Sequence, residues 1–265
     1  MFAINPFAAL SASIPPAVMQ GYVVLMIVLV AAGTLFDILH KGSARYFFTN
    51  WKTRKGREIG GGELVSIGVK TALVDVLASG EFCNSKRRIA HLLTMYGFVL
   101  HVIATVVLIF ANPASDLWPH LWWIGGIMVL VGGYWFWFFI RVDVAAEGSP
   151  RFRVMHADLF VLSLLASVTL GLLWAWLQSW VLFALYVLAT TVLFGSVPWS
   201  KFAHMFFKPA AAFEKRVSEA DGTNQNLPTL SRDDPEQQAR HSMELLRDAP
   251  MDMGLGIKRE APRHY

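Results

Sequence analysis

Five long apolar stretches constrain this chain more than any other feature of its sequence. A helix needs about 20 predominantly apolar residues to cross the hydrocarbon core of a bilayer. These stretches are apolar on all sides, whereas a helix that covers a soluble core keeps one polar face. We therefore predict an all-α integral membrane bundle of five transmembrane helices. The predicted spans are residues 17–39, 89–110, 120–140, 157–177 and 180–197.

The composition supports a membrane protein and excludes several kinds of site. Only 16% of the 265 residues are charged, against about 25% in ordinary soluble domains. The chain has one cysteine, Cys83, which excludes an internal disulfide, a zinc site built from cysteines, an iron–sulfur cluster and C-x-x-C-H haem attachment.

Charge divides the chain into a membrane domain and a polar tail. No charged residue precedes Asp37, and 18 of the 42 charged residues follow Pro209. We assign residues 1–208 to the five-span membrane domain and residues 209–265 to a polar, partly disordered cytoplasmic tail. A short helix is predicted at 234–247, with a proline in its first turn, where the missing N–H costs least.

Basic residues in alternate loops predict how the chain is oriented. The loop at 41–88 has ten Lys or Arg against four Asp or Glu, and further basic residues follow the third and fifth spans. The N-terminal segment, the loop at 111–119 and the turn near residue 178 together carry one charge, on Asp116. The positive-inside rule places the N-terminus outside and the C-terminus inside. We expect a multi-pass protein of the inner, cytoplasmic membrane, in contact with the lipid bilayer and with no nucleic acid.

Three further features suit a membrane bundle. Residues 64–82 are mildly apolar but include three charges, so we predict an amphipathic helix on the inner interface. The glycine pairs at 125–126 and 132–133 suit close helix packing. Tryptophans near the outer ends of the spans predict an aromatic belt at the interface. These are Trp118, Trp122, Trp123, Trp174, Trp176 and Trp180.

Five of the eight histidines lie within the predicted spans or at their ends. They are His91, His101, His120, His156 and His204. Ionisable residues in membrane spans are costly, so they are functional candidates by default. Neutral imidazole is a natural axial ligand for haem iron, because one ring nitrogen binds iron while a protein group holds the other N–H. The alternative for each is a hydrogen-bonded interface residue, which is the better interpretation of His120 at the outer belt.

Helix geometry separates these histidines into two levels. His101 lies ten residues beyond His91, about 15 Å deeper and about 80° around the helix, so the two cannot bind one iron together. His204 follows the fifth span and returns to the depth of His91, so these two can clamp one haem b, and His156 is a rival for either place. Gly97 leaves room where a flat macrocycle can pack. Basic residues placed to neutralise the haem propionates are Arg87, Arg88 and Lys201.

Four sequence blocks carry a resemblance to a known family. They are Arg88-Ile-Ala-His91, Leu100-His101, Ala157-Asp158-Leu159-Phe160 and, most specifically, Pro198-Trp-Ser-Lys-Phe-Ala-His204. With the basic loop, they make residues 17–216 resemble the membrane cytochrome b subunits of the respiratory nitrate reductase gamma-subunit superfamily. Within that superfamily the chain is most similar to the C subunit of the quinone-interacting membrane oxidoreductase and to the adenylylsulfate reductase membrane anchor.

The resemblance implies two haems b, held by two histidines on the second span and two on the fifth. Carried onto this chain, His91 and His204 ligate the inner haem, and His101 ligates one side of the outer haem. The fourth position, 18 residues before His204, is Tyr186 instead of histidine. One haem b is therefore expected and the second is doubtful. Tyr186 either ligates iron, hydrogen-bonds a quinone or packs.

The resemblance also implies a function as a non-catalytic or quinone-reactive subunit of an oxidoreductase complex. Such a subunit passes electrons between a cytoplasmic iron–sulfur or flavin enzyme, for example the adenylylsulfate reductase of sulfur metabolism, and the quinone pool through haem b. Two alternatives stay open. Tyr186 supports a haem-free membrane anchor or scaffold for a soluble redox enzyme, and the lack of an evident internal repeat argues against a small transporter.

Overall fold

The predicted spans fold as helices whose ends lie within a few residues of the predicted ones. The computed structural model describes residues 2–40, 43–53, 55–80, 85–111, 113–142, 152–155, 158–200, 204–224 and 227, with the backbone alone at 43, 44, 46, 204 and 206. The apolar helices are α1 (Pro16–His40), α4 (Ser85–Phe110), α5 (Leu117–Trp135), α6 (Leu159–Leu177) and α7 (Trp180–Gly195). No strand occurs in the described ranges, so the predicted all-α class is confirmed.

Four of the apolar helices are long enough to cross a membrane. They are α1, α4, α5 with its π-helical continuation η3 (Phe136–Ile140), and α6. The fifth, α7, has 16 residues and is followed by the 3-10 turn η5 (Val197–Trp199). The protein is therefore an all-α, multi-pass membrane bundle in which the last apolar helix is the shortest.

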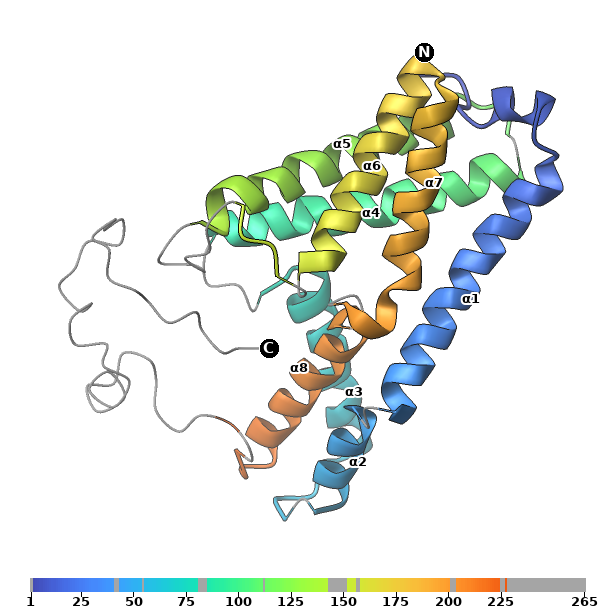
Figure 1. The fold of residues 1–265 in the computed structure, drawn as a ribbon. Coiled ribbons are helices and arrows are strands. Elements are labelled where there is room, and N and C mark those ends of the chain that lie inside the picture. Colours follow the sequence, from blue (N-terminus) through green and yellow to red (C-terminus); the bar gives the residue numbers. More distant parts are fainter. Residues whose placement is uncertain are drawn as a thin grey trace.

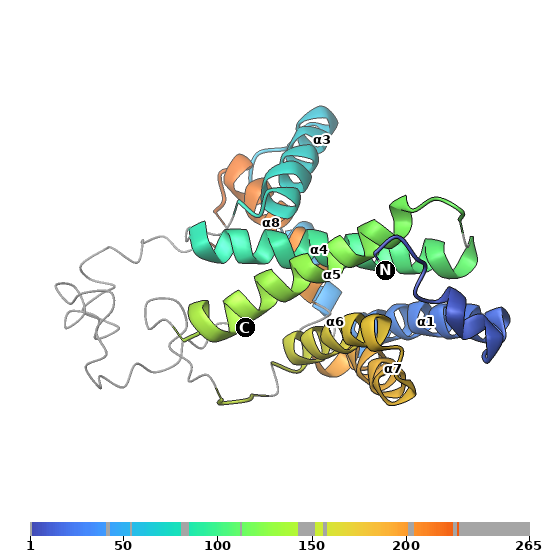
Figure 2. The same cartoon turned by 90° about the horizontal axis from the view of Figure 1, so that it is seen from above.

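The bundle consists of two helical hairpins and α1. The α4–α5 hairpin crosses the α6–α7 hairpin steeply (Figure 1, Figure 2). α1 and α4 meet at the upper right of Figure 1, from where α1 runs downward and α4 runs to the left across the picture. Where they meet, Asn5 Nδ2 donates to the carbonyl of Leu108 at 3.1 Å, and Gln20 Nε2 donates to that of Ile109 at 3.4 Å. We call this end, which includes the 3-10 turn η1 (Ala8–Ala12), the upper end of the bundle.

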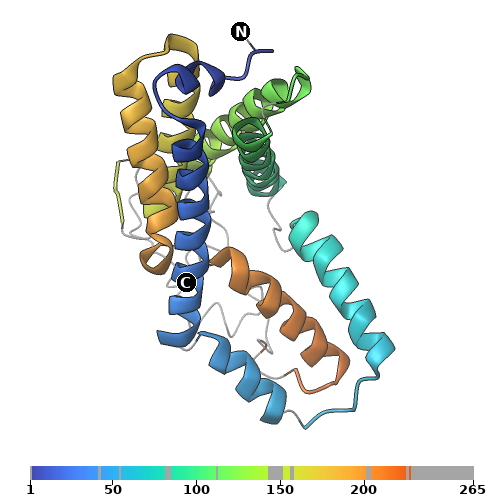
Figure 3. The same cartoon turned by 90° about the vertical axis from the view of Figure 1, so that its right-hand side faces the viewer.

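Shorter helices form a layer at the lower end (Figure 3). The layer consists of α2 (Ser43–Thr53), α3 (Gly61–Lys70) with its π-helical continuation η2 (Thr71–Leu77), and α8 (His204–Ala220). Polar contacts join them. Arg216 donates to both carboxylate oxygens of Asp75, at 2.6 and 2.9 Å, which raises the pKa of the Arg216 guanidinium. Asn50 Nδ2 donates to Glu214 Oε1 at 2.6 Å.

The lower layer extends what the sequence predicts for this region. α3 and η2 together form a helix over residues 61–77, where an amphipathic helix is predicted at 64–82. α2 has no counterpart among the predicted elements. The predicted tail begins at residue 209, but α8 runs through this position, since the pairs to Asp75 and Asn50 hold it against η2 and α2. The helix predicted at 234–247 lies outside the described residues.

Glycines bring the backbones of α4 and α5 into contact. A Cβ at Gly97 would lie 2.7 Å from the Gly125 carbonyl oxygen, and a Cβ at Gly125 would lie 2.7 Å from the backbone nitrogen of His101. A Cβ at Gly132 would lie 2.6 Å from the Ala90 carbonyl oxygen. The predicted packing role of the glycine pairs is confirmed for Gly125 and Gly132. The expectation that Gly97 faces a macrocycle is wrong, because the α5 backbone fills the space beside it.

Half of the predicted tryptophan belt points into the protein. Trp122, Trp123 and Trp174 are buried, whereas Trp176 and Trp180 are exposed. Trp174 and Trp176 differ because two residues advance about 200° around a helix and so reach opposite faces. The buried tryptophans belong to the core between the two hairpins. The belt prediction is therefore wrong for these three side chains.

A buried ion pair fixes the chain where it returns from η3 to α6. Arg141 is 1% exposed, and its Nη2 lies 2.5 Å from Asp158 Oδ2. The same nitrogen donates to the Arg153 carbonyl at 2.7 Å, and the guanidinium lies 4.1 Å from the ring centroid of Trp137. Asp158 Oδ2 also accepts the backbone N–H of Met155 at 2.9 Å. Because a buried charge is costly unless it is paired, this pair holds the start of α6 against the end of η3.

Candidate functional site

An apolar cavity of about 780 Å³ lies between α1, α4, α6 and α7. Its volume is within the range of about 300–1,000 Å³ that is usual for small-molecule sites. α1 lines it with residues spaced three or four apart from Val18 to Ile38, which form one face of that helix. At 1.5 Å per residue this face is about 30 Å long. The cavity therefore extends from the upper end of the bundle to the lower end.

His101 lines this cavity from α4, and the α5 backbone orients its ring. Nδ1 lies 2.8 Å from the carbonyl oxygen of Trp122, the two rings pack with centroids 4.6 Å apart, and the residue is 5% exposed. A carbonyl oxygen can only accept a hydrogen bond, so Nδ1 carries the proton and Nε2 of the neutral ring has a lone pair. In this state a histidine can bind a metal through Nε2 while a protein group holds Nδ1.

Valine in place of Gly125 is expected to displace His101 from this position. Its Cβ alone would meet the His101 backbone nitrogen at 2.7 Å, and overpacking a tight contact costs about 1–3 kcal/mol. We expect a lower thermal midpoint by circular dichroism, and a change in the 15N shifts of the His101 ring as its bond to Trp122 is lost. Gly21→Val is the matched control, since a Cβ there meets nothing within 4 Å. Equal losses in both variants would contradict the packing role of Gly125.

Tyr186 lines the same cavity from α7. Its ring stacks on Trp174, with centroids 5.8 Å apart and an interplanar angle of 8°. It also lies against Gly171, where a Cβ would meet the ring at 3.0 Å. The Tyr186 hydroxyl makes no hydrogen bond to any residue in the described part of the chain. The structure thus brings His101 and Tyr186, the two residues predicted at the outer level, to one cavity.

The rest of the cavity lining is apolar or uncharged. The hydroxyls of Ser167 and Thr190 hydrogen-bond each other at 2.7 Å, and the Tyr22 hydroxyl donates to the Val187 carbonyl at 3.0 Å. The Thr34 hydroxyl is buried and has no partner within the described ranges. Among the described residues, no Lys, Arg, Asp or Glu lines the cavity. A charged ligand would therefore lack a compensating charge from this lining.

His91 lies below the cavity, on the same face of α4 as the lining residue Phe98. Seven residues make almost two full turns, so the two are about 10.5 Å apart along the helix axis. His91 is exposed and does not line the cavity. Its Nδ1 lies 3.0 Å from Ser79 Oγ, which can accept the Nδ1 proton and so fix the tautomer that ligates through Nε2. His91 and His101 therefore lie at separate levels, in agreement with the predicted geometry.

The other residues predicted for the inner level are described only in part. His204 is the first residue of α8 and is described by its backbone alone. It precedes Met205, which lines the lower end of the cavity. His156 and Lys201 lie outside the described residues. The backbone of α8 therefore places His204 at the lower end of the cavity, below the level of Phe98.

Two basic residues and one histidine complete the predicted set. Arg88 Nε donates to the Ala78 carbonyl at 2.8 Å, which joins the start of α4 to the end of η2. Arg87 is partly buried beside it in the chain. His120 is exposed, and its Nδ1 lies 2.6 Å from the Asp116 carbonyl oxygen. This contact agrees with the interpretation of His120 as a hydrogen-bonded interface residue.

The N-terminal segment closes the upper end of the cavity. Phe7 and Leu10 are 4% and 5% exposed, and both line the cavity. The Phe7 ring packs against Trp122 and Trp174, with centroid distances of 5.8 and 5.4 Å. Trp122 packs against His101 and Trp174 stacks on Tyr186, so the Phe7 ring contacts the tryptophan neighbours of both polar residues. Apolar side chains therefore cap the upper end of the cavity.

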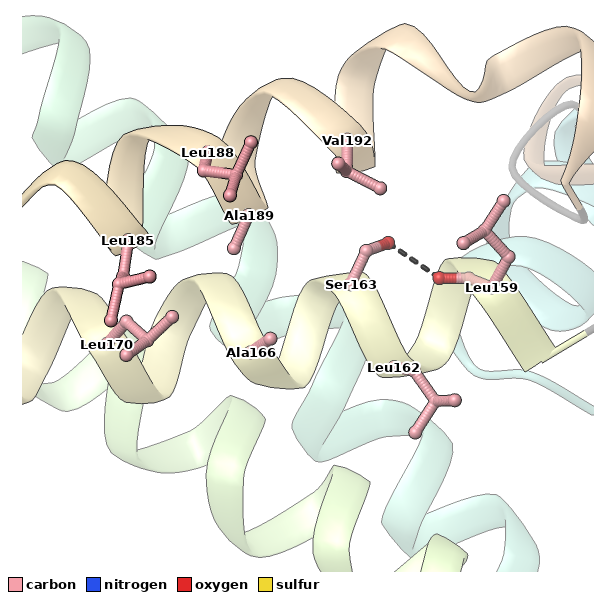
Figure 4. Close-up of a pocket in the computed structure, with 9 residues that line it drawn as sticks. All are labelled: Leu159, Leu162, Ser163, Ala166, Leu170, Leu185, Leu188, Ala189 and Val192. Atoms are coloured by element: carbon pink, nitrogen blue, oxygen red, sulfur yellow. Dashed lines mark hydrogen bonds between the residues drawn. The ribbon is translucent and has the colours of Figure 1, made fainter. Parts of the chain in front are cut away.

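A smaller groove of about 350 Å³ lies between α6 and α7 (Figure 4). Leu, Ala and Val side chains line it, apart from Ser163. The Ser163 hydroxyl donates to the Leu159 carbonyl at 2.6 Å, so it is used within its own helix. The chemistry of this lining suits lipid acyl chains and offers no group to a cofactor.

Sequence reasoning missed three groups that shape the candidate site. They are the Ser79 hydroxyl, the Thr34 hydroxyl and the Trp122 carbonyl. Ser79 is 1% exposed and has a φ of 49°, and such left-handed residues cluster at functional sites. The adjacent Gly80 signals a turn, but no sequence pattern shows that the turn faces His91. A backbone carbonyl such as that of Trp122 has no signature in the sequence at all.

Comparison with known proteins gives one distant likeness. No family model matches the chain, and no solved structure matches it significantly. The chain is 33% identical over 161 residues to Citrate utilization protein B of Escherichia coli, in an alignment that covers 55% of this chain and 42% of that protein. The chain thus spans about two fifths of the length of this curated relative. Within the described residues, no cluster of three or more His, Cys, Asp or Glu could hold a metal ion. A haem with two histidine ligands does not need such a cluster.

Proposed function

We propose that this chain is a membrane-anchored electron-transfer subunit that works between a soluble redox enzyme and the quinone pool through haem b. The supporting observation is that both α4 histidines have Nδ1 held by a protein oxygen, at 2.8 Å for His101 and 3.0 Å for His91. His101 is thereby set to ligate or accept through Nε2, and His91 is set in the same way when the Ser79 hydroxyl accepts its Nδ1 proton. His91 lies near the start of α4, at the lower end of the bundle, and His101 lies ten residues further along the helix, within the bundle.

The residue types at the lower end are those that one haem b requires. His91 and His204 would hold it from α4 and from the start of α8, with His156 as a rival ligand. Arg87, Arg88 and Lys201 would neutralise its propionates. When bound, haem supplies a one-electron carrier whose potential the protein tunes through the axial ligands. The chain's own residues would fix the ligand rings and set the depth of the site.

We propose that the bundle lies in the inner membrane and that the lower layer faces the cytoplasm. The partner would dock on this layer. Its basic residues suit an acidic partner surface, and that partner would supply the iron–sulfur or flavin chemistry. Adenylylsulfate reductase is one candidate from the family resemblance. The name of the Escherichia coli relative favours a second candidate, an enzyme of citrate utilisation.

The alternative proposal is a haem-free membrane anchor or scaffold for the same kind of soluble enzyme. The position of Tyr186 favours it, since that side chain is no histidine and is engaged in stacking on Trp174. In this case the hydrogen bond between His91 Nδ1 and Ser79 Oγ would serve only to join α4 to the end of η2.

Haem content of the purified, detergent-solubilised full chain decides between the two proposals. We expect about one haem per chain and a dithionite-reduced minus oxidised difference spectrum of the b type. The haem would be extractable, because the sequence has no C-x-x-C-H attachment site. A protein that is folded by circular dichroism, expressed with sufficient haem supply and yet without any b-type spectrum would refute the electron-transfer proposal and leave the scaffold.

A further inference from the structure

We infer that the cavity at the level of His101 and Tyr186 binds a lipid-soluble quinol, whose apolar tail lies along the α1 face, and that this level holds no second haem. The inference rests on the proposed function and assigns its quinone site. It is carried by three observations on the cavity: the absence of charge in its lining, the hydrogen-bonding state of His101, and the shape of the space beside α1.

The uncharged lining separates the two possible occupants. A haem brings two propionates, and burying a carboxylate without a partner is strongly unfavourable. No Lys or Arg lines the cavity among the described residues, and Phe7 and Leu10 close its upper end. A quinol ring is neutral and makes no such demand. Iron at this level would also find one imidazole, His101, since the residue on α7 is Tyr186.

The hydrogen-bonding state of His101 favours the reduced form of the ligand. Nδ1 donates to the Trp122 carbonyl at 2.8 Å, so Nε2 of the neutral ring can only accept. A quinol hydroxyl donates, whereas a quinone carbonyl accepts and would face the Nε2 lone pair unfavourably. The Tyr186 hydroxyl, which has no partner within the described residues, can donate to a ring oxygen of either form. His101 therefore distinguishes the two forms and Tyr186 does not.

The space beside α1 suits a long apolar tail that enters from the bilayer. The lining face of α1 runs from Val18 to Ile38 and is apolar except for Tyr22 and Thr34. Gln20 of α1 hydrogen-bonds the Ile109 carbonyl of α4 at the upper end, and from there α1 runs downward while α4 runs to the left (Figure 1). Since the upper end is closed, the ligand would enter laterally between these two helices.

The test uses the full chain in nanodiscs made of quinone-free phosphatidylcholine and phosphatidylglycerol. Calorimetric titration with decylubiquinol and decylubiquinone is expected to show one saturable site per chain and tighter binding of the quinol. Tyr186→Phe should weaken both ligands by about 2- to 12-fold, the effect of one hydrogen bond. His101→Ala should remove most of the preference for the quinol. Tyr134→Phe is the matched control, because the Tyr134 hydroxyl bonds Thr169 at 2.9 Å outside the cavity.

Other outcomes overturn the inference. One is quinol binding that Tyr186→Phe and His101→Ala leave unchanged. Another is a second haem in the wild type that His101→Ala removes, and a third is retention of phospholipid with no saturable quinol binding. Photolabelling of the wild type by an azido-quinol needs no variant, so a folding defect cannot affect it. We expect the label on α4 and α7. Haem measured on the same samples separates the proposals: no haem refutes the proposed function, whereas haem without a quinol site refutes this inference alone.

Discussion

Replacing His91 by alanine is expected to abolish the b-type spectrum of the purified protein while leaving its helix content unchanged. His91 is exposed at the lower end of α4, so its side chain contributes little packing that the alanine would lose. If Nε2 is an axial ligand, however, the haem loses one of its two bonds to the chain. We expect haem content to fall at least tenfold, because losing a ligand is more severe than losing a supporting residue, which itself costs about 10–100-fold in metal affinity.

Two variants make the His91 result specific. His120→Ala removes another exposed histidine whose Nδ1 also contacts a backbone carbonyl, that of Asp116 at 2.6 Å, and should keep full haem content. Ser79→Ala removes only the group that holds Nδ1 of His91 at 3.0 Å, so it should lower haem occupancy or shift the reduction potential without removing the haem. An unchanged spectrum in His91→Ala would refute the assignment of this ligand.

The membrane helices could be predicted from the sequence because the bilayer imposes their length and apolarity. The predicted span at 89–110 ends at Phe110, as α4 does, and the span at 157–177 ends at Leu177, as α6 does. The starts differ more. α4 begins at Ser85, because the basic residues before the predicted start continue its first turn instead of ending it. Apolarity marks where a helix enters lipid, not where its hydrogen bonding begins.

The side-chain directions were less predictable, because they depend on which helix lies beside which. Its place in the sequence predicts Trp122 at the membrane interface, yet this side chain is fully buried against His101. The sequence suggests that Gly97 leaves room for a macrocycle, but Gly97 contacts the α5 backbone. Periodicity gives the faces of one helix, and only the packing of α4 on α5 shows which face meets a neighbour.

The residues of the candidate site could be predicted in part, but their contacts could not. His91, His101 and Tyr186 could be named from residue type and spacing, and the structure places the last two on one cavity. Their partners could not be named. Ser79 lies on a left-handed turn that joins η2 to α4, and the group that fixes the His101 tautomer is a backbone carbonyl. Hydrogen bonds of this kind depend on tertiary contacts that leave no pattern in the sequence.

Removing the carboxylate of Asp158 is expected to have the largest effect on stability of any change considered. Asp158→Ala would remove a carboxylate that pairs with the buried Arg141 guanidinium, which is 1% exposed. Breaking a buried ion pair in this way costs about 3–5 kcal/mol, a large share of the roughly 5–15 kcal/mol that stabilises a typical protein. We expect a sharp fall in the thermal midpoint of the detergent-solubilised protein, together with proteolytic cleavage between η3 and α6.

The double variant Arg141→Met/Asp158→Ala tests whether the cost of Asp158→Ala comes from the buried positive charge of Arg141. Methionine can still pack on Trp137, over whose ring the guanidinium lies at 4.1 Å, and it brings no charge into the buried site. Replacing a buried pair by apolar groups is often neutral or stabilising, so the double variant should be more stable than Asp158→Ala alone. Lys215→Ala breaks an exposed pair with Glu219 and should change little, since exposed pairs contribute little. If the double variant is as unstable as Asp158→Ala, the loss comes from the other hydrogen bonds of Asp158, including the one from the Met155 N–H, and the charge argument is wrong.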